Sequence, residues 1–237
     1  ASTILGGVGN DTLTGGTEIN IISGEDGNDN LTGNRNKDTI LGGNGDDTIF
    51  GNNDDDTLTG GAGSDTLSGG TGNDTYLFNT NDVDTGESIS ESASGGTDTI
   101  SIITTTDFTN LSNSSLDEIE FINFGGASQT ATFTGAQLTA ETLSLSETVS
   151  GTSNVVIDIG FDGAVDFSDL TATTFTSGND TLTINGNSGN ETITGPNIAS
   201  TILGGAGSDT LTGGTKGDTL SGGTGNDTYL FNTNDVD

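Results

Sequence analysis

The sequence predicts an all-β chain, in which a parallel β-roll is stacked with a broader parallel β-solenoid and this unit is repeated in tandem. Three observations lead to this prediction. A nine-residue pattern runs without interruption from Gly6 to Leu77, short alternating segments rich in β-branched residues follow it, and the pattern returns near the end of the chain. A fixed period of this length indicates an architecture in which each repeat stacks on its neighbours.

The first repeat region divides into eight nonapeptides that share the same positions. They read GGVGNDTLT, GGTEINIIS, GEDGNDNLT, GNRNKDTIL, GGNGDDTIF, GNNDDDTLT, GGAGSDTLS and GGTGNDTYL. Glycine at positions one, two and four allows the positive φ of a tight turn. Positions seven to nine alternate polar, apolar and polar, which suits a short strand with one residue facing a core. Position eight is always apolar: Leu13, Ile22, Leu31, Ile40, Ile49, Leu58, Leu67 and Tyr76.

Position six is acidic in every repeat but the second, where it is Asn20. If two nonapeptides complete one coil, repeats n and n+2 lie above each other at a strand spacing of about 4.8 Å. The position-six side chains then form two files of close carboxylates, which would oppose folding unless a cation joined them. Carboxylate and main-chain carbonyl oxygens are the ligands that Ca²⁺ takes, so we expect several calcium ions. The candidate ligands here are Asp11, Asp29, Asp38, Asp47, Asp56, Asp65 and Asp74, with the loops around Gly7, Gly9, Gly43, Gly45, Gly61, Gly63, Gly70 and Gly72.

Repeats two and four depart from the pattern. Repeat two carries Glu18 and Asn20, while repeat four carries Arg35 and Lys37, two of the three basic residues of the chain. One hypothesis is that Glu18 pairs with Arg35 or Lys37, so that protein cations replace calcium at this level. The alternative is neutral drift in a tolerant loop.

The composition limits the classes of function. Three basic residues face 35 acidic ones in 237 residues, which gives a net charge of −32 and predicts disorder when no metal is bound. The chain lacks Cys and His, so disulfides, thiolate nucleophiles and the commonest general base are excluded, and we expect no catalysis. Its acidity argues against nucleic acid or an anionic membrane as partner. No apolar run has the length that spans a membrane, so membrane insertion is not expected.

Composition divides the chain into residues 1–84, 85–177 and 178–237. The middle segment is rich in Thr and Ser, and helix is the weaker interpretation of it because β-branched residues dominate. A separate β-sandwich and a broader β-solenoid both fit. We favour the solenoid, since GNDTLTING at 178–186 resumes the nonapeptide register without a linker. The strands we expect are Thr99–Thr104, Glu118–Phe124, Thr130–Thr134, Thr142–Ser146, Val155–Ile159 and Ala164–Phe167.

The second repeat region has five nonapeptides from Gly186 to Leu230. Glu191 and Ser200 replace the Asp of the motif at position six, so calcium should be sparser here than in the first region. The candidate ligands are Asp180, Asp209, Asp218 and Asp227, with the loops around Gly205, Gly207, Gly223 and Gly225.

Two long identities connect the repeat regions. Residues 1–5 recur at 199–203, and residues 67–84 recur unchanged at 220–237. We therefore expect the sequence to be an excerpt from a longer chain of tandem units.

The motifs GGVGND, GGNGDD, GGAGSD and GGTGND, each followed by a strand triplet, resemble the RTX (repeats-in-toxin) proteins. The resemblance implies a parallel β-roll with calcium held by the Asp residues and loop carbonyls. It also implies export of the unfolded chain by type I secretion and folding outside a Gram-negative-type bacterium. The segment containing LDEIEFINF resembles, more loosely, the β-solenoid of RTX-type bacterial surface-layer proteins.

These observations predict a secreted structural protein, such as a surface layer, a fibre or an adhesin stalk. The partners expected are like chains and cell-surface polysaccharide. The alternative is a calcium-triggered folding and export module of a secreted enzyme or toxin. An ice-binding roll is disfavoured, because the ranks of Thr and Asn that it needs at loop positions three and five are broken.

Overall fold

The computed structural model describes residues 1–91, 95–139, 142–148, 151–175 and 179–231, and confirms the fold class. The chain forms two compact units, Ala1–Gly125 and Gly126–Asp237, each built mainly from parallel strands. The boundary between the units lies inside the segment 85–177 that composition sets apart. In the described part of the chain, no helix is long and apolar enough to cross a membrane.

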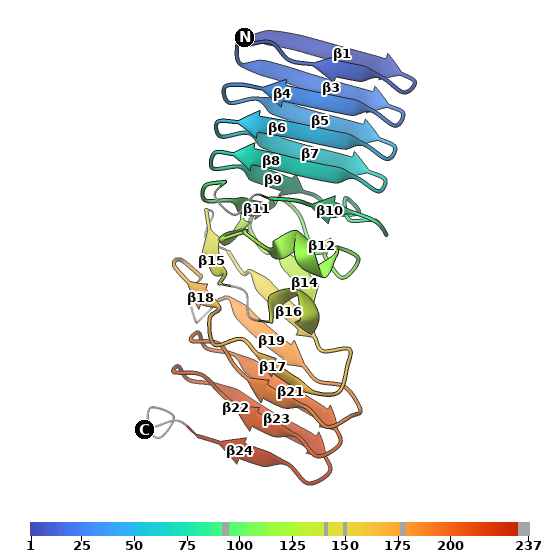
Figure 1. The fold of residues 1–237 in the computed structure, drawn as a ribbon. Coiled ribbons are helices and arrows are strands. Elements are labelled where there is room, and N and C mark those ends of the chain that lie inside the picture. The colour runs from blue at the N-terminus through green and yellow to red at the C-terminus, as the bar shows by residue number, and fades with distance from the viewer. Residues whose placement is uncertain (92–94, 140–141, 149–150, 176–178, 232–237) are drawn as a thin grey trace. The chain divides into compact units, whose positions relative to one another are not determined.

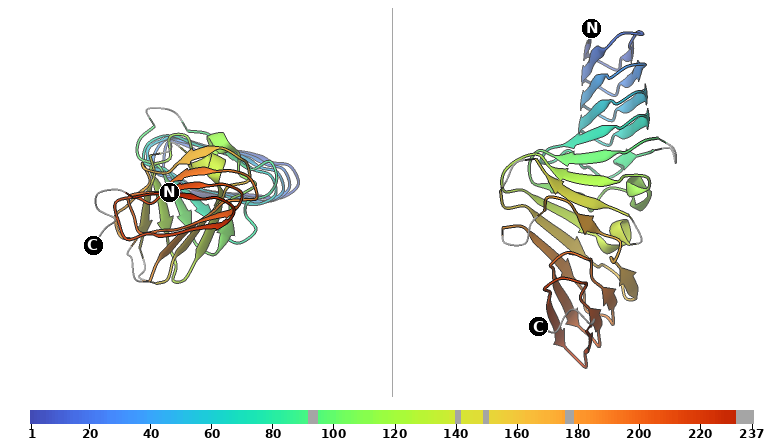
Figure 2. Two further views of the ribbon diagram at one scale, coloured as in Figure 1. Left: turned by 90° about the horizontal axis from the view of Figure 1, so that it is seen from below. Right: turned by 90° about the vertical axis from the view of Figure 1, so that its left-hand side faces the viewer.

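In the first unit, the strands from β1 to β11 alternate between two sheets (Figures 1 and 2). One sheet has the order β1-β3-β5-β7-β9-β11-β13 and the other has the order β10-β8-β6-β4-β2. The strands are β1 (Ser2–Val8), β2 (Thr12–Thr14), β3 (Asn20–Asp26), β4 (Asn30–Asn34), β5 (Thr39–Asn44), β6 (Thr48–Asn53), β7 (Thr57–Ala62), β8 (Thr66–Thr71), β9 (Thr75–Phe78), β10 (Ser88–Ile89), β11 (Thr99–Ile102), β12 (Thr106–Asp107) and β13 (Phe121–Phe124).

The register of the first roll places position eight of one repeat against position eight of the next but one. Ile22 lies opposite Ile40, and Ile40 lies opposite Leu58. All the position-eight side chains from Ile22 to Tyr76 are fully buried, while Leu13 in the terminal coil is half-buried. Burial of apolar surface along this file supplies the roll with its core, as the nine-residue pattern predicts.

The second unit has the same construction. One sheet has the order β14-β16-β19-β21-β23, another has the order β17-β20-β22-β24, and β15 pairs with β18. The elements are β14 (Thr130–Thr134), α1 (Gly135–Leu138), β15 (Ser144–Glu147), β16 (Asn154–Asp158), β17 (Ala164–Asp166), β18 (Thr171–Ala172), β19 (Thr181–Asn185), β20 (Thr192–Thr194), β21 (Thr201–Ala206), β22 (Thr210–Thr212), β23 (Thr219–Thr224) and β24 (Thr228–Leu230).

The middle segment is a solenoid and not a sandwich. In the first unit β11 pairs in parallel with β9, and β13 pairs with β11. In the second unit β16 pairs in parallel with β14 and then with β19, which leads directly into the second roll. The stacking offset is 18 residues in the rolls but 24 between Asp74 and Asp98 and 27 between Ser153 and Asp180, so the coils are wider here. Aromatic side chains fill the wider coils, as in the edge-to-face pair of Phe78 and Phe108 at 5.3 Å.

Each of the six strands expected in the middle segment overlaps an observed strand; Thr130–Thr134 has the expected bounds, and the other five have shifted ends. Two short helices were not expected, the 3-10 helix Asn113–Leu116 and the α-helix Gly135–Leu138. The two-residue strands β10, β12 and β18 were not expected either. These are single turns and bridges, too short to leave a periodic pattern in the sequence.

Candidate metal centre

The position-six side chains of the first roll form two continuous files. The backbone N–H of Asp29 donates to Oδ1 of Asp47 at 2.8 Å, and that of Asp38 donates to Oδ1 of Asp56 at 2.7 Å. Every level repeats this bond, because the parallel register brings residue i beside residue i+18. The donor–acceptor pairs are Asp11–Asp29, Asn20–Asp38, Asp29–Asp47, Asp38–Asp56, Asp47–Asp65 and Asp56–Asp74.

The other carboxylate oxygen, Oδ2, has no hydrogen-bond donor in the described structure. This holds for Asp11, Asp29, Asp38, Asp47, Asp56, Asp65 and Asp74. From Asp29 to Asp74 these side chains are at most 3% exposed. A buried anionic oxygen without a partner is costly, and native structures supply it with a donor or a cation. The orphaned Oδ2 atoms therefore fit calcium, which would be held by these carboxylates and the neighbouring loop carbonyls.

The pKa values of five of these carboxyl groups, those of Asp38, Asp47, Asp56, Asp65 and Asp74, are raised. Burial is the main cause, and it raises the pKa of Asp47, Asp65 and Asp74 to about 6 and that of Asp56 to about 7. Neighbouring carboxylates add to the increase, as Asp74 and Asp38 do for Asp56. At neutral pH, the ionised files thus need a positive charge beside them, and a bound divalent ion would supply it.

Glycine is needed at position one for space and not for backbone conformation. The expected positive φ is wrong at this position, because glycines such as Gly42 have ordinary φ values. A Cβ on Gly42 would lie 2.2 Å from Oδ2 of Asp47 and 2.5 Å from the carbonyl oxygen of Gly60. At position one the orphaned carboxylate oxygen therefore leaves no room for a side chain.

Positions two and four have the positive φ that the sequence predicts. In repeat five, Gly43 has φ +126° and Gly45 has φ +120°. The same conformation occurs at Gly7, Gly9, Gly61, Gly63, Gly70, Gly72, Gly205, Gly207, Gly223 and Gly225. Asparagine and acidic residues adopt it where glycine is missing, as at Asn34 and Asp54, which fits the tolerance of Asn and Asp for this region.

Four loops lack this pair of left-handed residues, namely 15–20, 186–191, 195–200 and 213–218. Asp218 lies in the last of them, and its Oδ1 accepts hydrogen bonds from the backbone N–H of Ser200 at 2.8 Å and from its hydroxyl at 2.9 Å. The loop of Asp218 thus differs in backbone from the loops of the first roll, and its role as a ligand stays a prediction.

The pairing expected between repeats two and four is wrong. Lys37 forms an ion pair with Asp55, and Glu18 has no ion pair in the described structure. The side-chain amide of Asn20 instead donates to Oδ1 of Asp38 at 3.0 Å and to the carbonyl oxygen of Glu18 at 2.5 Å.

Two further side-chain amides donate hydrogen bonds between the same two stacked loops. The amide of Asn34 donates to the carbonyl oxygen of Gly15 at 2.8 Å, and that of Asn36 donates to the carbonyl oxygen of Thr17 at 2.7 Å. At this level, neutral amide donors satisfy oxygens that elsewhere in the roll are candidates for calcium.

Both files continue past the last nonapeptide through acidic residues that the sequence analysis missed. The backbone N–H of Asp65 donates to Oε2 of Glu87 at 2.9 Å, and that of Asp74 donates to Oδ1 of Asp98 at 2.8 Å. The backbone N–H of Asp98 in turn donates to Oε2 of Glu120 at 2.6 Å. Burial raises the pKa of Glu87 to about 9 and that of Asp98 to about 7.

These extensions break the nine-residue count, so the count could not find them. A local signal was present. Glu87 precedes Ser88-Ile89 and Asp98 precedes Thr99-Ile100, as Asp74 precedes Thr75-Tyr76. The members of the files are therefore better identified by a local pattern than by the nine-residue period. In this pattern, an acidic residue directly precedes a strand that begins with a hydroxyl residue and an apolar residue.

In the second roll the best-formed file includes Glu191. The backbone N–H of Glu191 donates to Oδ1 of Asp209 at 2.9 Å, and that of Asp209 donates to Oδ1 of Asp227 at 3.1 Å. The second oxygens of Glu191 and Asp209 have no donor in the described structure. Asp180 accepts from the backbone N–H of Ser153 at 3.1 Å. The geometry of the first roll thus recurs with fewer complete levels.

Comparison with known protein families identifies the repeats. The model of the RTX calcium-binding nonapeptide repeat matches residues 5–40, 41–76 and 201–233. No curated protein shows significant similarity to the chain. Residues 5–40, 41–76 and 201–233 are RTX repeats, and repeats of this class bind calcium and are typical of proteins secreted by Gram-negative bacteria.

Proposed function

We propose that this chain is a calcium-rigidified extracellular structural protein, of the kind that builds a surface layer, a fibre or an adhesin stalk. One observation carries the proposal. Within each unit, the coils of the Thr/Ser-rich segment stack on the RTX coils in the same parallel register. In each unit, the part of the middle segment that belongs to it therefore continues the repeat stack of that unit. Such a continuous stack suits a structural protein better than a catalytic module.

Bound calcium would make the folded chain rigid. Every repeat of the first roll except the second carries a buried carboxylate oxygen without a donor in the described structure, and a bound ion would connect that repeat to the one stacked on it. Without calcium, the net charge of −32 and the desolvated carboxylates favour the unfolded chain. We therefore propose export in the unfolded state and folding outside the cell.

We also propose that the chain is not an enzyme. It has no His or Cys to act as base or nucleophile. The carboxylates of the files lie close enough together for acid–base chemistry, but they fit calcium.

The proposed partners are like chains and cell-surface polysaccharide. The 35 acidic residues include many on the surface, and calcium bound between such surfaces would join chains side by side. The same charge opposes binding to nucleic acid and to anionic membranes.

Electron microscopy and sedimentation of the folded chain at millimolar calcium test this proposal. We expect sheets or filaments that dissolve on chelation, or calcium-dependent binding to isolated cell-wall polysaccharide. A chain that stays monomeric at every calcium concentration and binds no polysaccharide would contradict the structural role.

The second candidate is a folding and export module of a secreted enzyme or toxin. The composition supports it, because an acidic chain with 28% hydrophobic residues stays unfolded until it meets calcium. Fusion of an unrelated passenger to the chain tests it in cells that contain a type I secretion system. Export of the passenger together with a monomeric folded chain would favour this candidate.

A further inference from the structure

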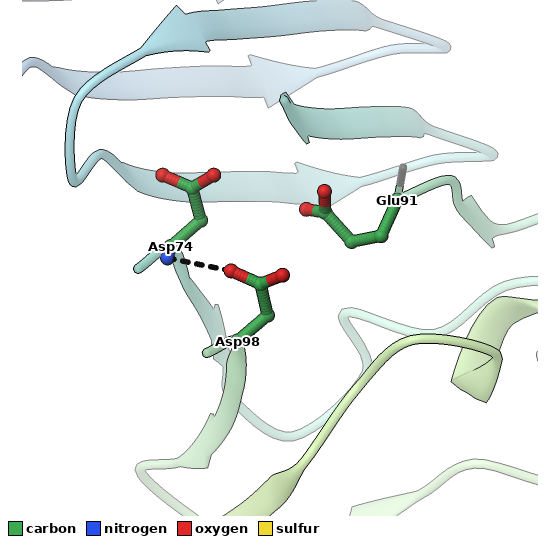
Figure 3. A group of neighbouring side chains, drawn as sticks. All are labelled: Asp74, Glu91 and Asp98. Atoms are coloured by element: carbon green, nitrogen blue, oxygen red, sulfur yellow. Dashed lines mark hydrogen bonds between the residues drawn. The ribbon is translucent and has the colours of Figure 1, made fainter. Parts of the chain in front are cut away.

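The end of the first roll brings together three carboxylates that come from different segments. Asp74 precedes β9, Glu91 follows β10, and Asp98 precedes β11 (Figure 3). One carboxylate oxygen from each lies within 4.8 Å of the other two. Only Asp74 belongs to a nonapeptide, so the nine-residue motif does not account for this cluster.

Hydrogen bonds hold Glu91 in this position. Its Oε1 accepts from the backbone N–H of Gly69 at 3.2 Å and from the hydroxyl of Tyr76, and its Oε2 accepts from the backbone N–H of Gly70 at 3.3 Å. The N–H of Gly69 also donates to the Tyr76 hydroxyl oxygen at 2.6 Å, which fixes the phenol beside the carboxylate. The side chain of Glu91 is therefore directed at the opening of the last nonapeptide loop.

The same loop presents the orphaned oxygen of Asp74. Asp74 is 1% exposed, and its Oδ2 has no donor in the described structure. A Cβ on Gly69 would lie 2.3 Å from this atom, so Oδ2 of Asp74 and Oε1 of Glu91 both lie next to Gly69. Asp98 is also 1% exposed, and it is linked to Asp74 through the bond from the Asp74 N–H to its Oδ1.

No protein cation neutralises this cluster in the described structure. The basic residue of this unit that forms an ion pair, Lys37, is paired with Asp55. Three ionised carboxylates at this separation repel one another strongly, and a hard divalent cation with oxygen ligands is the chemical species that stabilises them.

We propose that Asp74, Glu91 and Asp98 bind a calcium ion that closes the end of the first roll and joins its last nonapeptide to the segment that follows. This site differs from the levels inside the roll. There, one position-six carboxylate oxygen lies beside each position-one glycine, whereas this level adds Glu91. The higher carboxylate count gives the site a stronger preference for highly charged ions, including trivalent lanthanides. This calcium site would close the roll whether or not the chain has the proposed structural role.

Tyr76 provides a local reporter of this site. The chain has two tyrosines and no tryptophan, and the Tyr76 hydroxyl contacts Glu91. In a Tyr229→Phe background, emission of bound Tb³⁺ excited through tyrosine reports ions near Tyr76. The matched variants in that background are Glu91→Gln, which removes the charge at constant size, and Glu118→Gln, the same change at an exposed residue of the same unit.

We expect Glu91→Gln to weaken the tyrosine-sensitised Tb³⁺ titration by about tenfold or more, because even groups beyond the direct ligands typically change metal affinity about 10–100-fold. Calorimetry should find one calcium ion fewer per chain in this variant. Glu118→Gln should titrate like its parent. An unchanged Tb³⁺ affinity and an unchanged calcium count in Glu91→Gln would overturn the proposal.

A second measurement keeps the test decisive if a variant folds poorly. Far-UV circular dichroism at saturating calcium first establishes that each variant has the parent β-sheet content. A crystal structure of the unaltered chain grown with Tb³⁺ should then show anomalous density among the three carboxylates. Absence of an ion there, with ions present inside the roll, would refute the site without any substitution.

Discussion

Substitution of Gly42 by alanine should weaken calcium-dependent folding. The new Cβ would lie 2.2 Å from Oδ2 of Asp47, 2.9 Å from its Cγ and 2.5 Å from the carbonyl oxygen of Gly60. Real Cβ atoms essentially never come within 3.0 Å of another heavy atom, so the carboxylate must move away from the position proposed for metal binding. Gly42 has ordinary φ, so the effect comes from this contact and not from backbone strain.

The size of the expected loss of folding free energy follows from the overpacking that the added methyl group causes. Inserting a methyl group into such a contact costs about 1–3 kcal/mol. A loss of about 2 kcal/mol changes the folding equilibrium constant by a factor of roughly 30. If about five ions bind cooperatively on folding, this factor becomes a rise of about twofold in the calcium concentration at the midpoint.

Far-UV circular dichroism during calcium titration measures that midpoint. Gly16→Ala is the matched control, because Gly16 also has ordinary φ and a Cβ there would meet no atom within 4 Å. This control should leave the midpoint unchanged or lower it, since alanine restricts the unfolded chain by about 0.4–1 kcal/mol. Equal midpoints for Gly42→Ala and Gly16→Ala would refute the argument that position one is glycine to make room for the carboxylate.

Three further results are expected. Without calcium, β-sheet content at constant ionic strength should rise as the pH falls from about 7 to about 4. The reason is that burial raises the folded-state pKa of Asp47 to about 6 and of Asp56 to about 7, so the folded state binds protons more tightly than the unfolded chain. Circular dichroism in EGTA checks this, and a loss of β-sheet on acidification through that window would contradict it. Crystals grown in calcium should show an ion between Asp47 and Asp65 but none between loops 15–20 and 33–38, where Asn20, Asn34 and Asn36 supply amide donors; density at the second place would count against the amide substitution. Lys37→Ala should leave the calcium midpoint unchanged, because the pair of Lys37 with Asp55 is exposed to solvent, and a clear shift in the same titration would show that this pair supports the roll.

The regular part of this architecture is predictable because a single period controls it. Position eight defines the core and position six defines the files, so Ile40 and Asp47 could be placed from the sequence alone. Asn34 and Asp54 show that the left-handed loop positions tolerate substitution, which is why the roll continues through imperfect repeats.

The parts that could not be predicted depend on contacts between coils of unequal length. Glu87 and Asp98 enter the files only because the coils widen after the last nonapeptide, and no fixed spacing reveals that change. At repeats two and four, charge suggested an ion pair. The structure instead uses the amides of Asn20 and of the asparagines in the loop stacked on it. A short amide side chain can donate within the loop, while Lys37 extends to Asp55.

The most direct test of the account is the far-UV spectrum of the unaltered chain during calcium titration at neutral pH, followed by EGTA. The account predicts a disordered spectrum without calcium, a cooperative change to β-sheet at sub-millimolar to millimolar calcium, and full reversal on chelation, because the ionised carboxylate files cannot be buried without cations. A chain that is already β-sheet in EGTA would show that the wider coils carry the stability and would contradict the central role of calcium.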